Sequence, residues 1–331
     1  MSRVFTRIAL VALAAITLTA LCNLSAKAQT IGSEFATSYS VVDLGTPSGV
    51  AGPFGGLTLK NGDSNTLLLG GSANSAAGNV NQVSVVRNVI DGQNRITGFT
   101  GTASQLSTAA NIDGGLLYAP NGALLYTGYS NNTLGQIKPG SSTPDKIINL
   151  SSLGIAASTG TIQIIPAGFG VNSGKLLIAS YNSSDYYTAD LVADGNGTYD
   201  LANVSASLVN LGGGPEGIVY VPGGSPLFAN PSVLISEYAS GRVSAYEVNA
   251  LGIPIATSRR DFITGLNGAE GATIDASTGD FLFSTFGGSN RVISVRGLAP
   301  SAVVPEANTA ALLGLALPMI GAVAVVRRRK K

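Results

Sequence analysis

The sequence feature that most constrains the fold is an internal repeat. Its clearest copy occupies residues 211–248, where three short apolar segments are separated by a Pro/Gly turn and an Ala-Ser-Gly turn. Related stretches occur at residues 114–140 and 270–297. Repeats of this period, made of short strands and tight turns, are typical of a β-propeller, whose blades are four-stranded sheets around a central channel. The sequence therefore predicts an all-β propeller.

The spacing of the repeats indicates the number of blades. The units are 49 to 59 residues apart, which is room for four strands and their turns. Each unit ends in a short apolar segment, followed by a turn and by the first strand of the next unit. The predicted inner strands begin near Gly56, Gly115, Gly168, Gly217 and Gly271. We predict five blades, with six as the alternative if the joins at 104–113 or 151–167 contain strands.

The two ends of the repeat region are predicted to form one blade together. The last unit has three strands, ends at Arg296 and lacks a fourth. The segment Tyr39–Gly45 has the pattern of a strand without a neighbour in sequence, so we expect it to pair alongside Arg291–Val295 and close the ring. Closure of this kind removes exposed strand edges. The predicted propeller spans residues 37–297, and residues 29–36 have the pattern of a tail.

The apolar segments of the repeats are near-continuous rather than alternating. Examples are TLLLGG, ALLYTG, KLLIAS, VLISEY and FLFSTF. A sheet packed on both faces requires such runs, whereas a sheet with one solvated face shows alternation. Blades that stack against two neighbours meet this requirement. A β-sandwich or a β-helix is the alternative fold.

Residues 1–28 have the pattern of a cleaved signal peptide. A basic start precedes an apolar run over residues 8–21, and Ala26 and Ala28 form an A-x-A cleavage site. The run predicts a short signal helix that the Sec machinery would handle. A retained membrane anchor is the alternative, but the run is short for one. We therefore predict an exported protein.

The C-terminal end predicts a transmembrane helix. After a linker at residues 298–308, an uncharged segment covers residues 309–326, and as a helix it would span about 27 Å, enough for a hydrocarbon core. The basic tail 327–331 would stop transfer and stay on the cytoplasmic side. Its first members are Arg327, Arg328 and Arg329. A plain tail anchor is one interpretation of this arrangement.

The same region resembles a known sorting signal. Val304, Pro305 and Glu306 precede the apolar segment and the arginine cluster, and this order resembles the PEP-CTERM tail of Gram-negative bacteria. Ala307 stands where that family usually has a second proline. The resemblance implies that an exosortase-type transpeptidase removes the tail while the inner membrane holds the chain. It further implies a final location at the cell surface or in an extracellular matrix of exopolysaccharide.

Composition limits the chemistry of the predicted propeller. The sequence has no histidine, and its one cysteine, Cys22, lies in the predicted signal peptide. This excludes a Ser-His-Asp triad and thiolate or imidazole metal sites in the body, so hard cations on oxygen ligands remain. Between its two basic ends the chain has 11 basic against 17 acidic residues, a net charge of −6. An acidic body without a basic stripe argues against nucleic acid as a partner.

Two glutamates form the candidate site. Glu216 (GPEGI) and Glu270 (GAEGA) each precede a predicted inner strand. In a propeller this position lies at the mouth of the channel. Two carboxylates from adjacent blades could hold a calcium ion or act as an acid/base pair.

The Glu-Gly that opens each of these strands resembles the calcium-dependent lactonases of the gluconolactonase and regucalcin type. The resemblance implies a propeller with a calcium ion held by carboxylates in its channel. The aligned positions Gly55, Gly114 and Ala167 carry no ligand, and Asp113 lies one residue out of line. Ordinary turn chemistry, in which a glutamate accepts backbone hydrogen bonds or faces water, is the alternative.

Two other patterns have a structural explanation. Asp194–Asp200 (DGNGTYD) starts like a calcium loop, but Ser205 stands where such a loop needs a glutamate, so we predict a β-hairpin turn. Three tyrosines could form a platform for sugar rings or pack in the core, and we expect core packing. They are Tyr181, Tyr186 and Tyr187.

The sequence leaves three functions open. The first is a non-catalytic exported propeller that binds polysaccharide or protein, which the poverty of catalytic residue types favours. The second is a calcium-dependent lactonase-like or lyase-like enzyme that uses Glu216 and Glu270. The third is a purely structural matrix component. Calcium is the one cofactor that the residues suggest.

Overall fold

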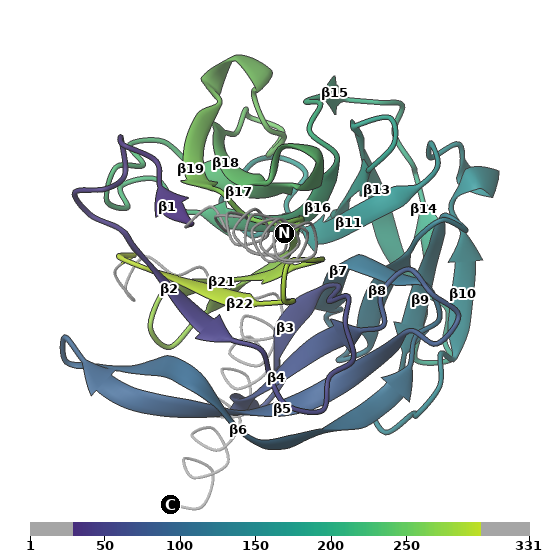
Figure 1. The fold of residues 1–331 in the computed structure, drawn as a ribbon. Helices are drawn as coiled ribbons and strands as arrows, with labels where there is room; N and C mark the ends of the chain where they lie inside the picture. The colour runs from purple at the N-terminus through teal and green to yellow at the C-terminus, as the bar shows by residue number, and fades with distance from the viewer. Residues whose placement is uncertain (1–28, 299–331) are drawn as a thin grey trace, which may run out of the picture.

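Five antiparallel sheets stand around one axis and form a five-bladed β-propeller (Figure 1). The computed structural model describes residues 29–298. No sixth sheet and no α-helix occurs in that part of the chain. The inner strands of neighbouring blades contact one another around the axis. The prediction of an all-β propeller with five four-stranded blades is therefore confirmed.

The strands follow the chain around the ring. Blade 1 contains β3 (Leu57–Lys60), β4 (Asp63–Gly71), β5 (Asn79–Ile90) and β6 (Gln93–Thr108). Blade 2 contains β7 (Ile112–Tyr118), β8 (Leu124–Gly128), β9 (Thr133–Ile137) and β10 (Lys146–Asn149). Blade 3 contains β11 (Thr159–Ile164), β12 (Leu176–Ser180), β13 (Asp185–Ala193), β14 (Tyr199–Ala202) and the short β15 (Val209–Asn210).

The last two blades take up the N-terminal segment. Blade 4 contains β16 (Pro215–Val221), β17 (Ser232–Glu237), β18 (Arg242–Glu247), β19 (Arg260–Thr264) and, at its outer edge, β1 (Thr30–Ile31). Blade 5 contains β20 (Ala269–Asp275), β21 (Asp280–Thr285), β22 (Val292–Arg296) and β2 (Ser40–Gly45). Three single-turn 3-10 helices, at Ser151–Leu153, Tyr238–Ser240 and Ala256–Ser258, lie in the connections.

The ring closes where the prediction placed the closure. Strand β2 pairs antiparallel with β22, with Val41 opposite Val295 and Val42 opposite Ser294. Blade 5 thus takes its fourth strand from the N-terminal end of the described chain. Figure 1 shows β2 (purple) lying beside β22 (yellow-green).

The N-terminal segment differs from the prediction of a tail at residues 29–36. Strand β1 pairs with β19, and the side chain of Phe35 is fully buried. Its ring packs edge to face against Phe262, with ring centroids 5.0 Å apart. The segment belongs to the fold because it covers the edge of blade 4 and buries an aromatic side chain that composition alone did not mark as structural.

Blade 3 corrects the predicted register of the third unit. We predicted its inner strand near Gly168, but that strand is β11, which lies within the join at 151–167. Gly168, with φ +87°, lies in the connection between β11 and β12. The fourth place of blade 3 is shared, since β14 pairs with one part of β13 and β15 with another.

The apolar runs are buried on both faces, as their composition predicted. In β12, Leu176 and Ile178 belong to the apolar cluster shared with blade 2. Leu177 and Ala179 belong to the cluster shared with blade 4. Successive side chains of a strand point to opposite faces, so a blade between two neighbours needs apolar residues at every position.

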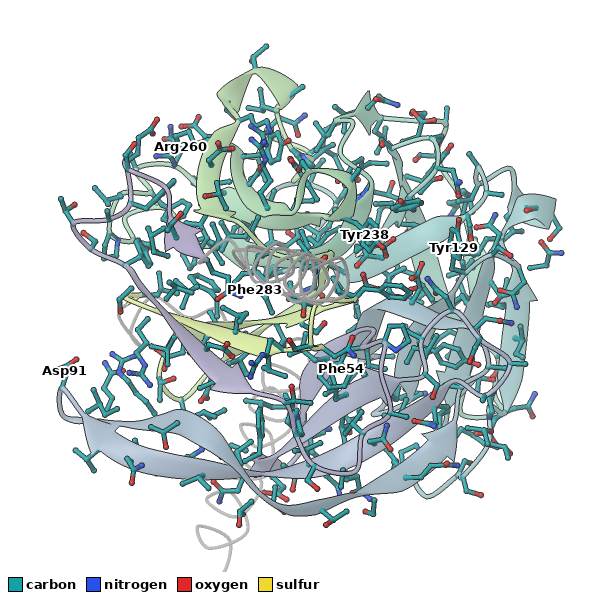
Figure 2. All side chains as sticks on the ribbon, in the orientation of Figure 1. Phe54, Asp91, Tyr129, Tyr238, Arg260 and Phe283 are labelled. Atoms are coloured by element: carbon teal, nitrogen blue, oxygen red, sulfur yellow. The ribbon has the colours of Figure 1, made fainter. Side chains whose placement is uncertain are left out.

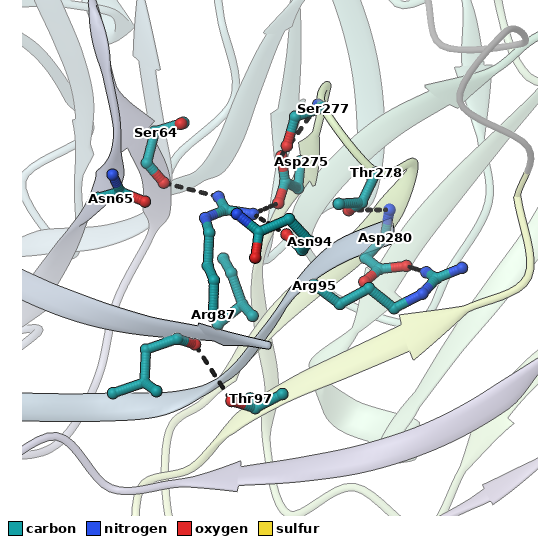
Figure 3. A network of polar contacts seen from close by, with 12 residues as sticks. Ser64, Asn65, Arg87, Asn94, Arg95, Thr97, Asp275, Ser277, Thr278 and Asp280 are labelled. Carbon is teal, nitrogen blue, oxygen red and sulfur yellow. Dashed lines mark hydrogen bonds and ion pairs between the residues drawn. The ribbon is translucent and has the colours of Figure 1, made fainter. Parts of the chain in front are cut away.

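A long hairpin ties blade 1 to blade 5 by buried ion pairs (Figure 3). Arg87 on β5 pairs with Asp275 at 2.7 Å, and Arg95 on β6 pairs with Asp280. In both pairs the arginine side chain is 7% exposed and the aspartate 1%. Arg87 also donates to the carbonyl oxygens of Ser64 and Asn94.

Several predictions concern residues outside the described part of the chain. These are the signal peptide at 1–28, the sorting motif at 304–306, the transmembrane helix at 309–326 and the basic tail at 327–331. Within residues 29–298, no helix is long and apolar enough to cross a membrane.

Candidate functional site

A ring of five glycines lets the inner strands approach one another at one end of the channel. A side-chain carbon added to Gly114 would lie 1.8 Å from the carbonyl oxygen of Glu216, and one added to Gly217 would lie 2.4 Å from that of Glu270. No other residue fits at such a distance. The ring consists of Gly56, Gly114, Gly160, Gly217 and Gly271. The backbones of neighbouring blades are therefore nearly in contact around the axis.

The residue before each of these glycines lies at the end of the channel where the inner strands begin. In three blades it is acidic: Asp113, Glu216 and Glu270. One carboxylate oxygen from each lies within 4.8 Å of the other two. The three residues are between 1% and 3% exposed. The structure thus brings together the two predicted glutamates and adds an aspartate that we had placed out of line.

Asp113 was missed because the sequence offers two glycines in succession, Gly114 and Gly115. We aligned Gly115 with Gly217, but the structure makes Gly114 the equivalent residue. A second signal identifies the correct alignment. The residue two positions before each acid has a left-handed backbone. The angle φ is +60° at Asn111 before Asp113, +64° at Gly214 before Glu216 and +66° at Gly268 before Glu270. Asn and Gly are the residues that adopt this conformation readily. The pattern Asn/Gly-x-acid-Gly therefore marks all three positions.

The three carboxylates are not compensated by cationic side chains. Among the described residues, Oδ2 of Asp113, Oε2 of Glu216 and both carboxylate oxygens of Glu270 are buried without a hydrogen-bond donor, so a hydrogen bond between Asp113 and either glutamate requires a proton on one of the two carboxyl groups. Burial raises the pKa of Asp113 to about 8. Burial, and then the charge of Asp113, raises the pKa of Glu216 and of Glu270 well above the usual range. No lysine or arginine is among the main causes of these shifts, and none of residues 29–298 forms an ion pair with the three acids.

A buried group of acids in this state requires either protons or a bound cation. Oxygen atoms that share one calcium ion, at about 2.3–2.6 Å each, lie at most about 5 Å apart, so a separation within 4.8 Å fits. Asn74 supplies a further oxygen beside them. Its side chain hydrogen-bonds to Asp113 and partly offsets the rise in pKa there, and its Oδ1 is buried without a partner.

The channel is almost closed beneath the carboxylates. The space there is about 10 Å³, roughly the size of one water molecule. Its lining includes the threonines Thr58, Thr161 and Thr273 together with Leu116 and Ile218. The carboxylates therefore lie at the end of the channel where the inner strands begin, with little space behind them.

The remaining sequence candidates fall in other places. Tyr186 and Tyr187 are buried, as expected for core residues, whereas Tyr181 is partly exposed and follows the end of β12. The segment at Asp194 is a hairpin turn, as predicted. The Asp194 carboxylate accepts hydrogen bonds from the backbone of Asn196 and from Lys146, so its oxygens are already engaged.

The solved structures to which this chain is similar share only its fold. The chain is 14% identical to a provisionally assigned gluconolactonase, over 82% of this chain and 99% of that one, with a TM-score of 0.41. It is 13% identical to a provisionally assigned 6-phosphogluconolactonase from Bacteroides uniformis, over 71% of this chain but only 65% of that one, with a TM-score of 0.40. It is 12% identical to an auxiliary nutrient binding protein from Bacteroides ovatus, over 78% and 76%, with a TM-score of 0.39. No protein-family model matches the sequence, and no curated protein is significantly similar to it.

Proposed function

We propose that this protein is an exported, non-catalytic binding propeller whose axial carboxylates hold a divalent cation. The observation that supports the proposal is the trio Asp113, Glu216 and Glu270, buried together with oxygens that have no partner. Keeping three acids in such a place is costly without a counter-charge. A bound cation would supply the counter-charge and remove this cost.

Calcium is the cation that the donor set favours. Every candidate ligand atom is an oxygen, from three carboxylates and the amide of Asn74. The sequence has no histidine, and it has no cysteine apart from Cys22. Oxygen-only ligand sets suit calcium, magnesium and manganese rather than zinc or copper. Calcium accepts the irregular geometry of ligands that come from three separate strands, whereas magnesium demands a near-ideal octahedron.

A binding role fits the site better than catalysis. If one ion engages all three acids, none is left as a free general base, and no histidine stands nearby to replace it. The enzyme alternative is supported by the pKa of Asp113, raised to about 8, because perturbed acids cluster at active sites. Hydrolysis of a sugar lactone that is dependent on calcium and abolished in Asp113→Asn would favour the enzyme.

The central test is calcium binding by the full chain. Calcium at a hundredfold excess over its Kd should raise the free energy of unfolding by about 2.7 kcal/mol, measured by denaturant titration with and without chelator. Glu216→Gln and Glu270→Gln should each remove most of this increase. Glu34→Gln, an exposed acid on the periphery, is the matched control and should keep it. An equal response of all four proteins to calcium would refute the proposal.

The ligand of the propeller is proposed to be polysaccharide or protein outside the cell. The supporting features are the signal-peptide pattern at residues 1–28 and the PEP-CTERM-like tail at 304–331. Retention of the protein on the producer's own exopolysaccharide tests the first ligand class. A complete lack of retention, with no protein partner recovered, would favour a purely structural matrix component.

Export and sorting are tested separately. We propose cleavage after Ala28 and removal of the tail near Val304–Glu306 by an exosortase-type enzyme. Intact mass of the cell-surface form should lack both ends of the sequence. A mass that retains residues 309–331 would instead identify a plain tail anchor.

A further inference from the structure

Four aromatic side chains form an arc, here called the collar, at the same end of the propeller as the carboxylates. Each directly follows the second strand of its blade, and that strand ends where the antiparallel inner strand begins. Ser72 occupies the equivalent place in blade 1. The collar consists of Tyr129, Tyr181, Tyr238 and Phe286. Figure 2 shows Tyr238 near the centre of the ring of sheets, in contrast to Asp91 and Arg260 at its periphery.

The rings of the collar meet one another edge to face. Successive centroids are 5.7 Å apart, and successive planes are inclined by 86°, 80° and 73°. Rings that lay flat across the channel would be nearly parallel to one another. The observed inclinations are those of rings at steep angles to one another, not of rings stacked flat across the channel. All four side chains are partly exposed.

The collar lies against the segments that carry the acids. A side-chain carbon on Gly214 would lie 2.7 Å from the ring of Tyr181, and one on Gly268 would lie 3.0 Å from the ring of Tyr238. These glycines come two residues before Glu216 and Glu270. Burial and then the charge of Glu216 raise the pKa of Tyr181, while burial and then Glu270 do so for Tyr238. The collar and the carboxylates thus lie next to each other, and we call this region the well.

The net negative charge of the well favours a cationic ligand. Three ionised carboxylates around one divalent cation leave one negative charge, and no lysine or arginine of the described chain forms an ion pair with them. Five places spaced 5.7 Å apart on a circle lie about 5 Å from its centre, within the roughly 6 Å over which an aromatic ring attracts a cation. We propose that the collar binds an alkylammonium group. This inference rests on the proposed function, because the bound ion sets the residual charge.

Blade 1 leaves the collar open on one side. It contributes Ser72 where the other blades have an aromatic ring, and Gly55 where three of them have an acid. The substituent that carries the ammonium group can leave the well through this gap. The other four blades present aromatic walls, so the gap fixes the direction in which the rest of the ligand extends.

The experiment compares choline with its neutral isostere, 3,3-dimethyl-1-butanol. Both are titrated into the full chain in the presence of calcium and followed by calorimetry and by the proton NMR shift of their methyl groups. Choline should bind, with its methyl signals moved upfield by the ring currents, and the isostere should bind at least about tenfold more weakly. Tyr181→Leu and Tyr238→Leu should each weaken choline binding by about twofold to thirtyfold.

The control is Tyr118→Leu, the same change at the opposite end of inner strand β7, which should leave choline binding unchanged. Equal binding of choline and its isostere, or equal binding to all variants, would overturn the proposal. Thermal melting of each variant shows whether it is folded. Calcium calorimetry on the same samples separates the two proposals: calcium binding without choline binding refutes the ammonium site alone, and absent calcium binding refutes the cation site.

Discussion

Two groups of buried acids differ in how their charge is compensated. Asp275 and Asp280 lie between blades 1 and 5, and each meets an arginine from the long hairpin of blade 1 (Figure 3). Burial raises the pKa of Asp280 to about 6, with Arg95 opposing the rise. This value leaves the group ionised at neutral pH. The axial trio has the same burial and no arginine, and the pKa of Asp113 rises to about 8.

The difference separates structural acids from functional ones. An acid whose counter-charge is supplied by the chain closes an interface, even where, as at Asp280, one carboxylate oxygen has no hydrogen-bond partner. An acid that the fold buries without a partner adds a free-energy cost that only a proton or an external cation removes. Acids of the same type and the same burial therefore have different roles. A neighbouring arginine marks a structural acid, and its absence marks an acid that can bind a cation.

The largest expected effect comes from removing an arginine that neutralises one of the interface acids. That acid is then buried without a cation, as the axial acids are. Arg95→Met should lower the free energy of unfolding at pH 8 by about 3–5 kcal/mol, because Asp280 is left buried without its cation. The loss should shrink at pH 5, where Asp280 takes up a proton. Denaturant titration at both pH values measures it. The double variant Arg95→Met/Asp280→Leu should recover most of the stability, and a double variant as unstable as the single one would contradict the explanation.

A smaller effect is expected from separating the axial acids. Gly114→Ala places a methyl group against the carbonyl oxygen of Glu216 and should cost about 1–3 kcal/mol, with weakened calcium binding. Denaturant unfolding and calcium calorimetry measure the two parts. Gly98→Ala is the matched control, since the added carbon meets open space there. If Gly114→Ala binds calcium like the parent protein, close approach of the inner strands is not what assembles the site.

The stability of the calcium-free protein should depend on pH because of the axial trio. Their pKa values are raised in the folded state, so the folded protein holds protons that the unfolded chain has released. Stability should therefore fall as the pH rises from about 4 through about 8, by at most about 1.4 kcal/mol per pH unit for each proton. Thermal melting in chelator measures the slope. Glu216→Gln/Glu270→Gln should flatten it, and so should calcium; an unchanged slope in both cases would contradict the assignment.

The smallest effect is expected at a surface ion pair. Lys138 and Asp145 lie 3.2 Å apart, with side chains 38% and 20% exposed. Water already compensates such charges, so Lys138→Met should change the free energy of unfolding by less than about 1 kcal/mol. Denaturant titration beside Arg95→Met gives the comparison directly. A loss as large as that of Arg95→Met would show that burial does not determine how much an ion pair contributes to the free energy of unfolding.

The sequence by itself indicated the repeat, five as the preferred number of blades and the partner of the closing strand. These follow from local patterns, because near-continuous apolar runs bounded by glycine turns specify buried strands wherever they occur. The missing fourth strand of the last unit and the unpaired segment Tyr39–Gly45 then had one solution, and the pairing of Val41 with Val295 confirms it.

Only the tertiary structure added Asp113 to the predicted pair Glu216 and Glu270. Asp113, Glu216 and Glu270 are separated by more than a hundred residues from first to last, and their encounter depends on five backbones approaching at the ring of glycines. Whether a buried acid finds an arginine is likewise a property of the assembled ring, since Arg95 reaches Asp280 only across the closure of blades 1 and 5. Strand patterns are local and appear in the sequence, whereas compensation of charge depends on neighbours that only folding supplies.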